Sequence, residues 1–137
     1  MTRQESFILD TDICVYLLNG KAPAAESRLR RLPRDSVGVT AITVAELRYG
    51  ALNSARPQKN MERVHLFASP LRLFPFGDRE ASAYAAIRTD LRRRGLPIGA
   101  MDMLIAATCI TAGAVLVTNN VREFARVPGL TVDNWAD

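Results

Sequence analysis

The sequence predicts an α/β protein with a central, mainly parallel sheet that is covered by helices on both faces. Short apolar runs of strand length alternate along the chain with longer segments in which apolar residues repeat at helical spacing. Strands that alternate with helices in this way are typical of parallel sheets. With 137 residues, of which 48% are hydrophobic, the chain can bury a proper core, and we expect residues 1–137 to form a single domain.

The first half of the chain contains two expected strands and one expected helix. The first strand is the apolar run at residues 7–9, and a loop with Gly and Pro is expected at residues 20–23. The second strand is expected at residues 37–40. It is followed by a helix at residues 42–52, where apolar residues recur with helical spacing, and by a loop at residues 55–60.

The second half contains two further helices. Residues 78–94 open with Asp78, a residue type suited to an N-cap, and end at Gly95, which is typical of a helix C-terminus. Residues 103–112 form a nearly all-apolar helix, which we expect to be central and buried. The remaining strands are expected at residues 71–74, 114–117 and, as a weaker run, 130–132.

Composition excludes several classes of protein. Cys14 and Cys109 lie in apolar runs without zinc-site spacing, and His65 is the single histidine, so we expect reduced core cysteines and neither a zinc nor a haem centre. No apolar run approaches the length of a membrane span, and Asp10 and Asp12 interrupt the N-terminal one. We therefore expect a cytoplasmic protein. The net charge is +4 and Arg supplies 16 of the 18 basic residues, which suits a phosphate-rich partner but also fits a GC-rich genome.

Three apolar segments carry isolated acidic residues and no basic residue. The acids are Asp10 and Asp12 in residues 6–20, Glu46 in residues 36–47, and Asp102 in residues 95–121. A half-buried carboxylate is costly unless a positive group faces it, and the local sequence offers none. The simplest tertiary solution brings the acids together around a cation. Carboxylates without His or Cys partners favour a hard metal ion such as Mg²⁺ or Mn²⁺.

The expected sheet places these acids at one edge. Asp10 directly follows the first strand, and Asn119 and Asn120 follow the strand at 114–117, so they belong at the carboxyl ends where open α/β sheets bind ligands. Glu46 lies one turn into the helix after the second strand, and Asp102 opens a helix whose dipole favours its charge. Each residue also has a purely structural explanation: the aspartates as helix caps, Glu46 as the partner of a distant Arg, and the asparagines as turn formers.

Four motifs resemble those of PIN-domain ribonucleases and, more narrowly, of the VapC toxins of VapBC toxin–antitoxin pairs. They are Phe-Ile-Leu-Asp-Thr-Asp at residues 7–12, Ala-Glu-Leu-Arg-Tyr-Gly at 45–50, Ile-Gly-Ala-Met-Asp-Met-Leu-Ile-Ala-Ala at 98–107, and Val-Thr-Asn-Asn-Val-Arg-Glu-Phe at 117–124. The resemblance covers nearly the whole chain, and the order and spacing of all four motifs make it specific.

The resemblance implies a PIN-like three-layer α/β/α sandwich and a Mg²⁺- or Mn²⁺-dependent endoribonuclease. Asp10, Glu46 and Asp102 match the acidic metal and catalytic positions of the family, and Asn120 falls where many members have a fourth acid. Glu123 lies near that position and would supply the missing charge. Asp12 departs from the more usual Asn. The resemblance also implies a homodimer, a VapB-type antitoxin that blocks the active-site groove, and a structured RNA substrate such as tRNA.

Two other functions remain open from the sequence. Asn120 in place of an acid is compatible with a non-catalytic RNA-binding or regulatory module of the same fold. The Asp-Thr-Asp at 10–12 also mimics the opening motif of haloacid-dehalogenase phosphatases. That chemistry needs a Thr or Val at position 14, which is Cys, and a Lys after a later strand. Candidate surfaces for RNA phosphates are Arg92, Arg93 and Arg94, and a second cluster of Arg28, Arg30, Arg31 and Arg34.

Overall fold

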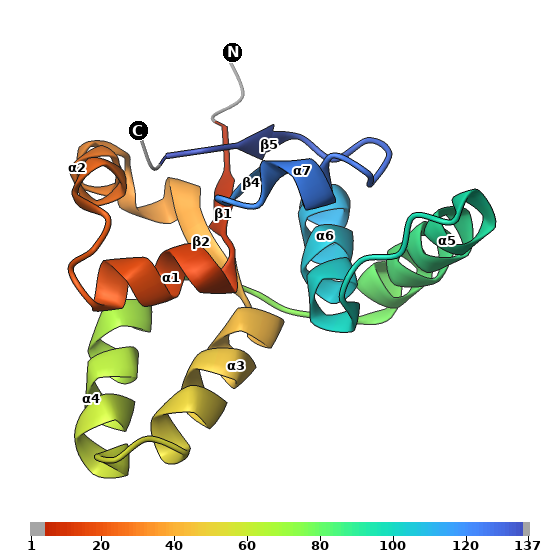
Figure 1. The fold of residues 1–137 in the computed structure, drawn as a ribbon. Coiled ribbons are helices and arrows are strands. Elements are labelled where there is room, and N and C mark those ends of the chain that lie inside the picture. The colour runs from red at the N-terminus through yellow and green to blue at the C-terminus, as the bar shows by residue number, and fades with distance from the viewer. Residues whose placement is uncertain (1–4, 136–137) are drawn as a thin grey trace.

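Five parallel strands form the centre of the molecule in the computed structural model, which describes residues 5–135 (Figure 1). Their order across the sheet is β3-β2-β1-β4-β5, and all four neighbouring pairs are parallel. The strands are β1 (Phe7–Leu9), β2 (Val37–Thr40), β3 (Arg72–Phe74), β4 (Val115–Val117) and β5 (Val132–Asp133). The predicted parallel sheet is therefore confirmed.

One face of the sheet is covered by helices from the first half of the chain (Figure 1). They are α1 (Thr11–Leu18), α2 (Pro23–Arg31), α3 (Ala41–Leu52) and α4 (Pro57–Ala68), with a short 3₁₀ turn, η1, at Arg34–Ser36. The apolar core on this side joins Phe7, Leu9, Val37 and Val39 of the sheet to the inner faces of these helices. Trp135 closes it, because its ring packs against Phe7 with the ring centres 5.3 Å apart.

The opposite face is covered by α5 (Asp78–Arg94), α6 (Ala100–Ala112) and α7 (Val121–Phe124). Successive residues of a strand point to opposite faces, so Ile8 and Leu116 enter this second core while their neighbours enter the first. Helix α6 lies deepest: Ile105 and Ala106 are fully buried, as the all-apolar run predicted. With helices on both faces, the protein is the three-layer α/β/α sandwich that the resemblance implied.

The sequence located most elements and misplaced some of their boundaries. The strands at 7–9 and 37–40 and the helix at 78–94 are confirmed, whereas the predicted loop at 55–60 is wrong because α4 already begins at Pro57. Pro57 occupies the first helical turn, where the missing N–H costs nothing. Asp78 is the first helical residue and not the cap; the preceding Gly77 is the cap, and its N–H donates to Glu80.

The order of the strands creates a switch point beside β1. The chain moves outward from β1 through β2 to β3, then crosses back so that β4 pairs with the other side of β1. The carboxyl ends of all the strands face the same edge, because the strands are parallel. In sheets of this kind, ligands bind where the winding direction reverses. Asp10, which directly follows β1, lies at this point.

Two further observations bear on the class of protein. Cys14 and Cys109 are buried free thiols, as predicted, and His65 is exposed on α4. Within residues 5–135, no helix is both long and apolar enough to cross a membrane.

Candidate active site

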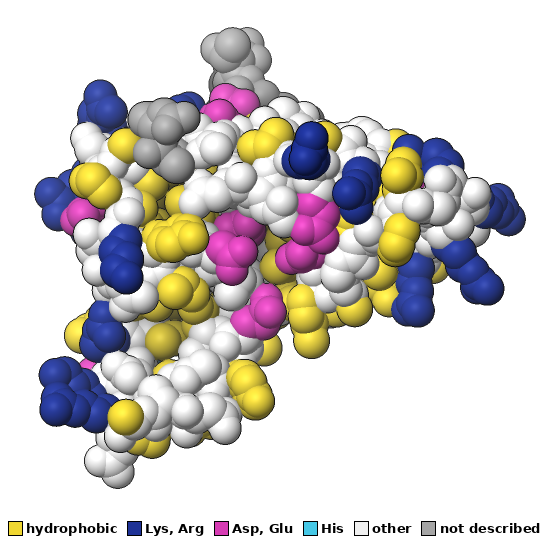
Figure 2. Space-filling model, in the orientation of Figure 1, with side chains coloured by type: hydrophobic (Ala, Val, Ile, Leu, Met, Phe, Trp, Pro, Cys, Tyr) yellow, Lys and Arg dark blue, Asp and Glu magenta, His cyan; other side chains and the backbone are white. Residues whose placement is uncertain are grey.

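A cavity of about 370 Å³ opens at the carboxyl edge of the sheet. Its lining comes from three segments that are distant in sequence: the start of α1, the second turn of α3 and the start of α6. The lining residues are Asp10, Thr11, Asp12, Glu46, Gly99, Ala100, Met101 and Asp102. Figure 2 shows acidic side chains gathered near the middle of this face, with Lys and Arg side chains toward both sides. Asp10, Glu46 and Asp102 thus meet at one cavity, as the topology predicted.

Asp10 is the most buried carboxylate of the site, with 4% of its surface exposed. It caps α1, since its Oδ1 accepts a hydrogen bond of 2.8 Å from the N–H of Ile13, and the Thr118 hydroxyl donates to its Oδ2. Burial raises the pKa of Asp10 to about 6; the two hydrogen bonds oppose the shift, and the charges of Asp12 and Glu46 add to it. Capping and membership of the acidic cavity are therefore compatible roles for one side chain.

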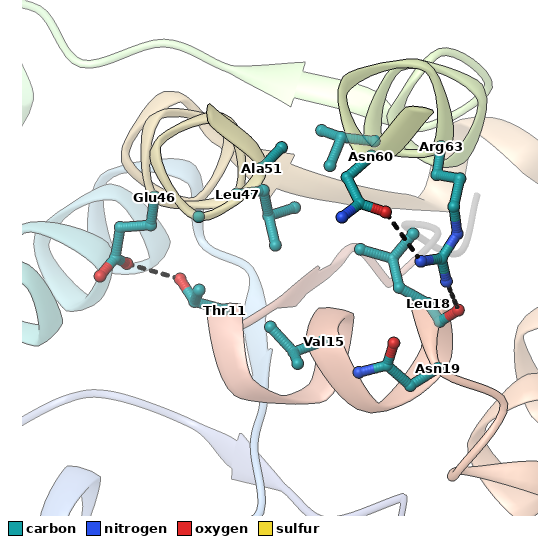
Figure 3. Close-up of a pocket in the computed structure, with 11 residues that line it drawn as sticks. Thr11, Val15, Leu18, Asn19, Glu46, Leu47, Ala51, Asn60 and Arg63 are labelled. Carbon is teal, nitrogen blue, oxygen red and sulfur yellow. Dashed lines mark hydrogen bonds between the residues drawn. The ribbon is translucent and has the colours of Figure 1, made fainter. Parts of the chain in front are cut away.

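Glu46 faces the start of α1 from the second turn of α3 (Figure 3). The Thr11 hydroxyl donates to its Oε1 over 2.6 Å, and the same hydroxyl lies 3.0 Å from the hydroxyl of Thr43. Glu46 is half-buried. Within the described part of the chain, the ion pairs join other acids to arginines, so the predicted alternative of a distant Arg partner for Glu46 finds no support.

Asp102 is the third residue of α6, because the helix begins at Ala100, three residues before the expected start at residue 103. No side chain caps this helix, so the alternative that Asp102 is a plain cap is wrong. The pKa of Asp102 is raised to about 6, mainly by burial and then by the charges of Glu123, Asp10 and Glu46. The acids of the cavity therefore act on one another electrostatically, although they come from separate elements.

Asn120 and Glu123 lie beside the cavity rather than in its lining. Asn120 is the N-cap residue that precedes α7. Its backbone N–H donates to the Thr118 hydroxyl over 2.9 Å, and its side-chain amide donates to Glu123. Glu123 also accepts from the backbone N–H of Gly99, over 3.2 Å. The amide of Asn120 thus orients Glu123, whose charge reaches Asp102. Asn119 is exposed in the turn between β4 and α7.

The sequence reasoning missed the buried threonines around the acids. Thr40, Thr43 and Thr118 are all fully buried, and each lies in a hydrogen-bond chain that ends on Asp10 or Glu46. A signal was present, since Thr40 and Thr118 each follow an apolar strand core at the edge where the acids were expected. Threonine is common in strands, however, so the pattern alone did not separate these residues from ordinary strand ends.

The donor chemistry of the cavity fits a hard divalent cation. Its charged groups are carboxylates only. Burial is the main cause of the raised pKa values of Asp10 and Asp102, and the neighbouring negative charges add to the shift. Within residues 5–135, no three acidic, His or Cys side chains are grouped tightly enough to surround an ion as they stand. Asp10, Glu46 and Asp102 are the residues that would hold one.

The raised pKa values predict how stability depends on pH in metal-free buffer. Both carboxyls have pKa values near 6 in the folded protein against 3.8 ordinarily, so the folded state takes up protons first as the pH falls. The stability that protonation contributes is fully present below about pH 4 and is lost as the pH rises through about 6. After a reduction for the partial exposure of Asp102 to solvent, we expect the free energy of unfolding to increase by about 1.5 kcal/mol from pH 8 to pH 5. Urea denaturation in the presence of a chelator measures this free energy. A lower free energy of unfolding at pH 5 than at pH 8 would contradict the raised pKa values of the two carboxyls.

Comparison with known proteins supports the same reading of the fold. The PIN domain family matches residues 7–130. The chain is 37% identical to Ribonuclease VapC2 of Rickettsia felis over 130 residues, which covers 94% of this chain and 97% of the relative. It is 36% identical to the tRNA(fMet)-specific endonuclease VapC of Salmonella typhimurium over 129 residues, covering 94% and 97% of the two chains.

Solved structures agree with these relatives. The crystal structure of VapBC2 from Rickettsia felis, bound to a DNA fragment from their promoter, superimposes with a TM-score of 0.89 at 36% identity and covers 94% of this chain and 98% of that chain. DNA-bound VapBC from Salmonella typhimurium gives a TM-score of 0.91 at 35% identity, with 96% and 99% covered. The chain therefore belongs to the PIN-domain family, and within it to the VapC ribonucleases.

Proposed function

We propose that this ribonuclease is a metal-dependent endonuclease that hydrolyses phosphodiester bonds in structured RNA and acts as the toxin of a toxin–antitoxin pair. The observation that carries the proposal is the acidic cavity: Asp10, Glu46 and Asp102 line one space at the switch point of the sheet, with no Arg or Lys among its lining residues. The site also contains no nucleophile–histidine pair, because His65 lies away from it on α4.

Each acid has a distinct place in the proposed chemistry. Asp10 and Asp102 would provide carboxylate oxygens to hold a Mg²⁺ or Mn²⁺ ion, and Glu46 would provide a third, either directly or through water. Such an ion would lower the pKa of the attacking water and would neutralise charge on the phosphodiester. Thr118 and Ile13 keep the Asp10 carboxylate in one orientation. Asn120 acts at the margin of the site by orienting Glu123.

Exposed arginines near the end of α5 support an RNA substrate. Arg92 and Arg93 are exposed in its last turn, whereas Arg94 pairs with Asp90 and also donates to the carbonyl of Arg126. In the second cluster, two arginines already pair with acids, namely Arg28 with Asp133 and Arg30 with Glu26. We therefore assign phosphate contacts to Arg92 and Arg93 first. The relative from Salmonella is named as an endonuclease specific for tRNA(fMet), and tRNA is the substrate class we propose.

An antitoxin of the VapB type and a second copy of the chain are the proposed protein partners. The solved relatives are VapBC complexes, which supports the antitoxin. A second cavity next to the acids, between α1, α3 and α4, is lined by apolar side chains such as Val15, Leu47 and Val64, and suits a peptide partner (Figure 3). Tyr49 and Leu52 of α3 are 71% and 60% exposed, which supports burial of this helix in a homodimer.

The proposed activity is tested by incubating the purified protein with tRNA in Mg²⁺, Mn²⁺ or EDTA at two salt concentrations. We expect discrete fragments that require metal, and cleavage that weakens by at least about tenfold between 50 and 200 mM salt, because phosphate contacts release counterions. Metal-independent binding of RNA without fragments would instead favour a non-catalytic module. Hydrolysis of a small phosphomonoester would favour a phosphatase, although neither Lys21 nor Lys59 lines the acidic cavity.

A further inference from the structure

We infer that Thr43 is a positioning residue for Glu46 and that it acts through the hydroxyl of Thr11. The inference rests on the proposed function, since it takes Glu46 to be a working carboxylate of the site. Thr43 lies three residues before Glu46, on the first turn of α3, and its side chain is fully buried. It does not line the acidic cavity, so any effect on the chemistry must pass through its neighbours.

Three threonines form a continuous chain of hydroxyl groups that ends on Glu46. The Thr40 and Thr43 hydroxyls are 3.4 Å apart, those of Thr43 and Thr11 are 3.0 Å apart, and Thr11 is 2.6 Å from Oε1 of Glu46. The backbone N–H of Thr43 also donates to the Thr40 hydroxyl over 3.0 Å, which makes Thr40 the N-cap of α3. The chain thus runs from the end of β2 to the carboxylate.

The protons in this chain can point in only one direction. The Thr11 hydroxyl donates its single proton to Oε1 of Glu46. Its oxygen then accepts the proton of Thr43, and the oxygen of Thr43 accepts that of Thr40. The oxygen of Thr40 is itself held by a backbone N–H. Every hydroxyl in the chain is therefore oriented by its predecessor.

The burial of Thr40 and Thr43 strengthens the hydrogen bonds of this chain. Thr40 and Thr43 have no exposed surface, so water does not compete for their hydroxyls. Thr11 is only half-buried, and without the donor from Thr43 its hydroxyl would be free to rotate away from Glu46. The chain also joins the segment that carries Asp10 to the helix that carries Glu46 (Figure 3). It therefore sets where these two carboxylates stand relative to each other.

The experiment compares Thr43→Val, which has the same shape but no hydroxyl, with Thr43→Ser, which keeps the hydroxyl. Thr108→Val is the matched control: Thr108 is equally buried on a helix, but its hydroxyl donates only to the carbonyl of Leu104. Each protein is assayed for Mn²⁺ affinity by calorimetry without RNA, for kcat and KM of tRNA cleavage, and for thermal unfolding.

We expect Thr43→Val to lose about tenfold in Mn²⁺ affinity and in kcat, as is typical when a partner of a metal-binding side chain is removed. KM for tRNA should stay unchanged, since no RNA-facing residue is altered. Thr43→Ser and Thr108→Val should both keep wild-type affinity. Unchanged affinity in Thr43→Val, or an equal loss in Thr108→Val, would overturn the inference.

The experiment also covers two other outcomes: a Thr43→Val variant that does not fold, and a wild-type protein that binds no Mn²⁺. If Thr43→Val does not fold, Thr11→Val removes the last hydroxyl of the chain from a half-buried position, and wild-type Mn²⁺ affinity in that variant would overturn the inference. If the wild-type protein itself binds no Mn²⁺, the proposed function is wrong and the inference falls with it. If the wild-type protein binds Mn²⁺ and Thr43→Val binds it equally well, the inference about Thr43 is wrong but the proposed function stands.

Discussion

Replacing Asp102 by Asn is expected to reduce RNA cleavage by at least about 10³-fold while the protein stays folded. Asn keeps the shape of the side chain but removes the negative charge that a divalent cation needs. Asp102 lines the acidic cavity and is half-buried, and it makes no capping hydrogen bond that the folded state would lose. The loss should therefore appear in activity and in metal affinity, not in the content of folded protein.

The same substitution should make the metal-free protein slightly more stable at neutral pH. The pKa of Asp102 is raised to about 6 by burial and by the charges of Glu123 and Asp10, which means that the ionised carboxylate destabilises the folded state. Removing it should raise the free energy of unfolding by about 1 kcal/mol, a value reduced for the partial exposure of the side chain to solvent.

Asp78→Asn provides the control for both effects. Asp78 is also in the first turn of a helix, but it is exposed and remote from the acidic cavity. For both variants, tRNA cleavage measures activity, Mn²⁺ titration measures metal affinity, and urea denaturation measures the free energy of unfolding. Retention of cleavage by Asp102→Asn at the native metal dependence would contradict the assignment of this residue.

Gly38→Ala is expected to destabilise the fold by at least about 3 kcal/mol. Gly38 lies in β2 and pairs with Arg72 of the edge strand β3. A Cβ at this position would lie 2.2 Å from the backbone oxygen of Arg72 and 2.6 Å from the ring of Phe74. A backbone atom of a paired strand cannot move aside without breaking the β2–β3 ladder, so the cost is large.

Gly50→Ala makes the same chemical change where there is space. Gly50 lies in α3, and a Cβ there would meet nothing within 4 Å, so this variant should gain about 0.5–1 kcal/mol from reduced backbone entropy of the unfolded chain. Thermal and urea unfolding of the two variants, followed by circular dichroism, provide the comparison. Equal stability of Gly38→Ala and the wild-type protein would show that β3 can shift away from β2.

The sequence predicted the sheet well because buried parallel strands leave a strong local signal. Residues 7–9 and 37–40 are apolar, short and flanked by polar residues, and they form β1 and β2 with those bounds. The start of α4 was missed because its first residues, Pro57 to Asn60, have the composition of a loop. The close approach of β3 to Gly38 was also unpredictable, since it depends on which strands become neighbours.

The acids of the cavity were found for the same topological reason. Asp10, Glu46 and Asp102 follow or flank buried elements, so a parallel sheet brings them to one edge whatever the details of packing. Asn120 is different: it was expected among the acids, yet its amide binds Glu123 at the margin. The partners of a side chain depend on rotamers and distances of a few ångströms, which the spacing of motifs does not encode. The metal and catalytic roles of all four residues stay predictions.

The order of the strands also determines when the site can form during synthesis of the chain. Asp10 and Glu46 are synthesised early, Asp102 follows within the crossover from β3 to β4, and Thr118 comes only after β4. The N–H of Asp10 pairs with the carbonyl of Val117 in β4. A chain that ends before β4 therefore carries Asp10, Glu46 and Asp102, but it lacks Val117 and Thr118, whose hydrogen bonds hold Asp10 in place. Parallel crossovers of this kind also form slowly, because their contacts are distant in sequence. We therefore expect the site to reach its final form only after β4 has been synthesised and has joined the sheet.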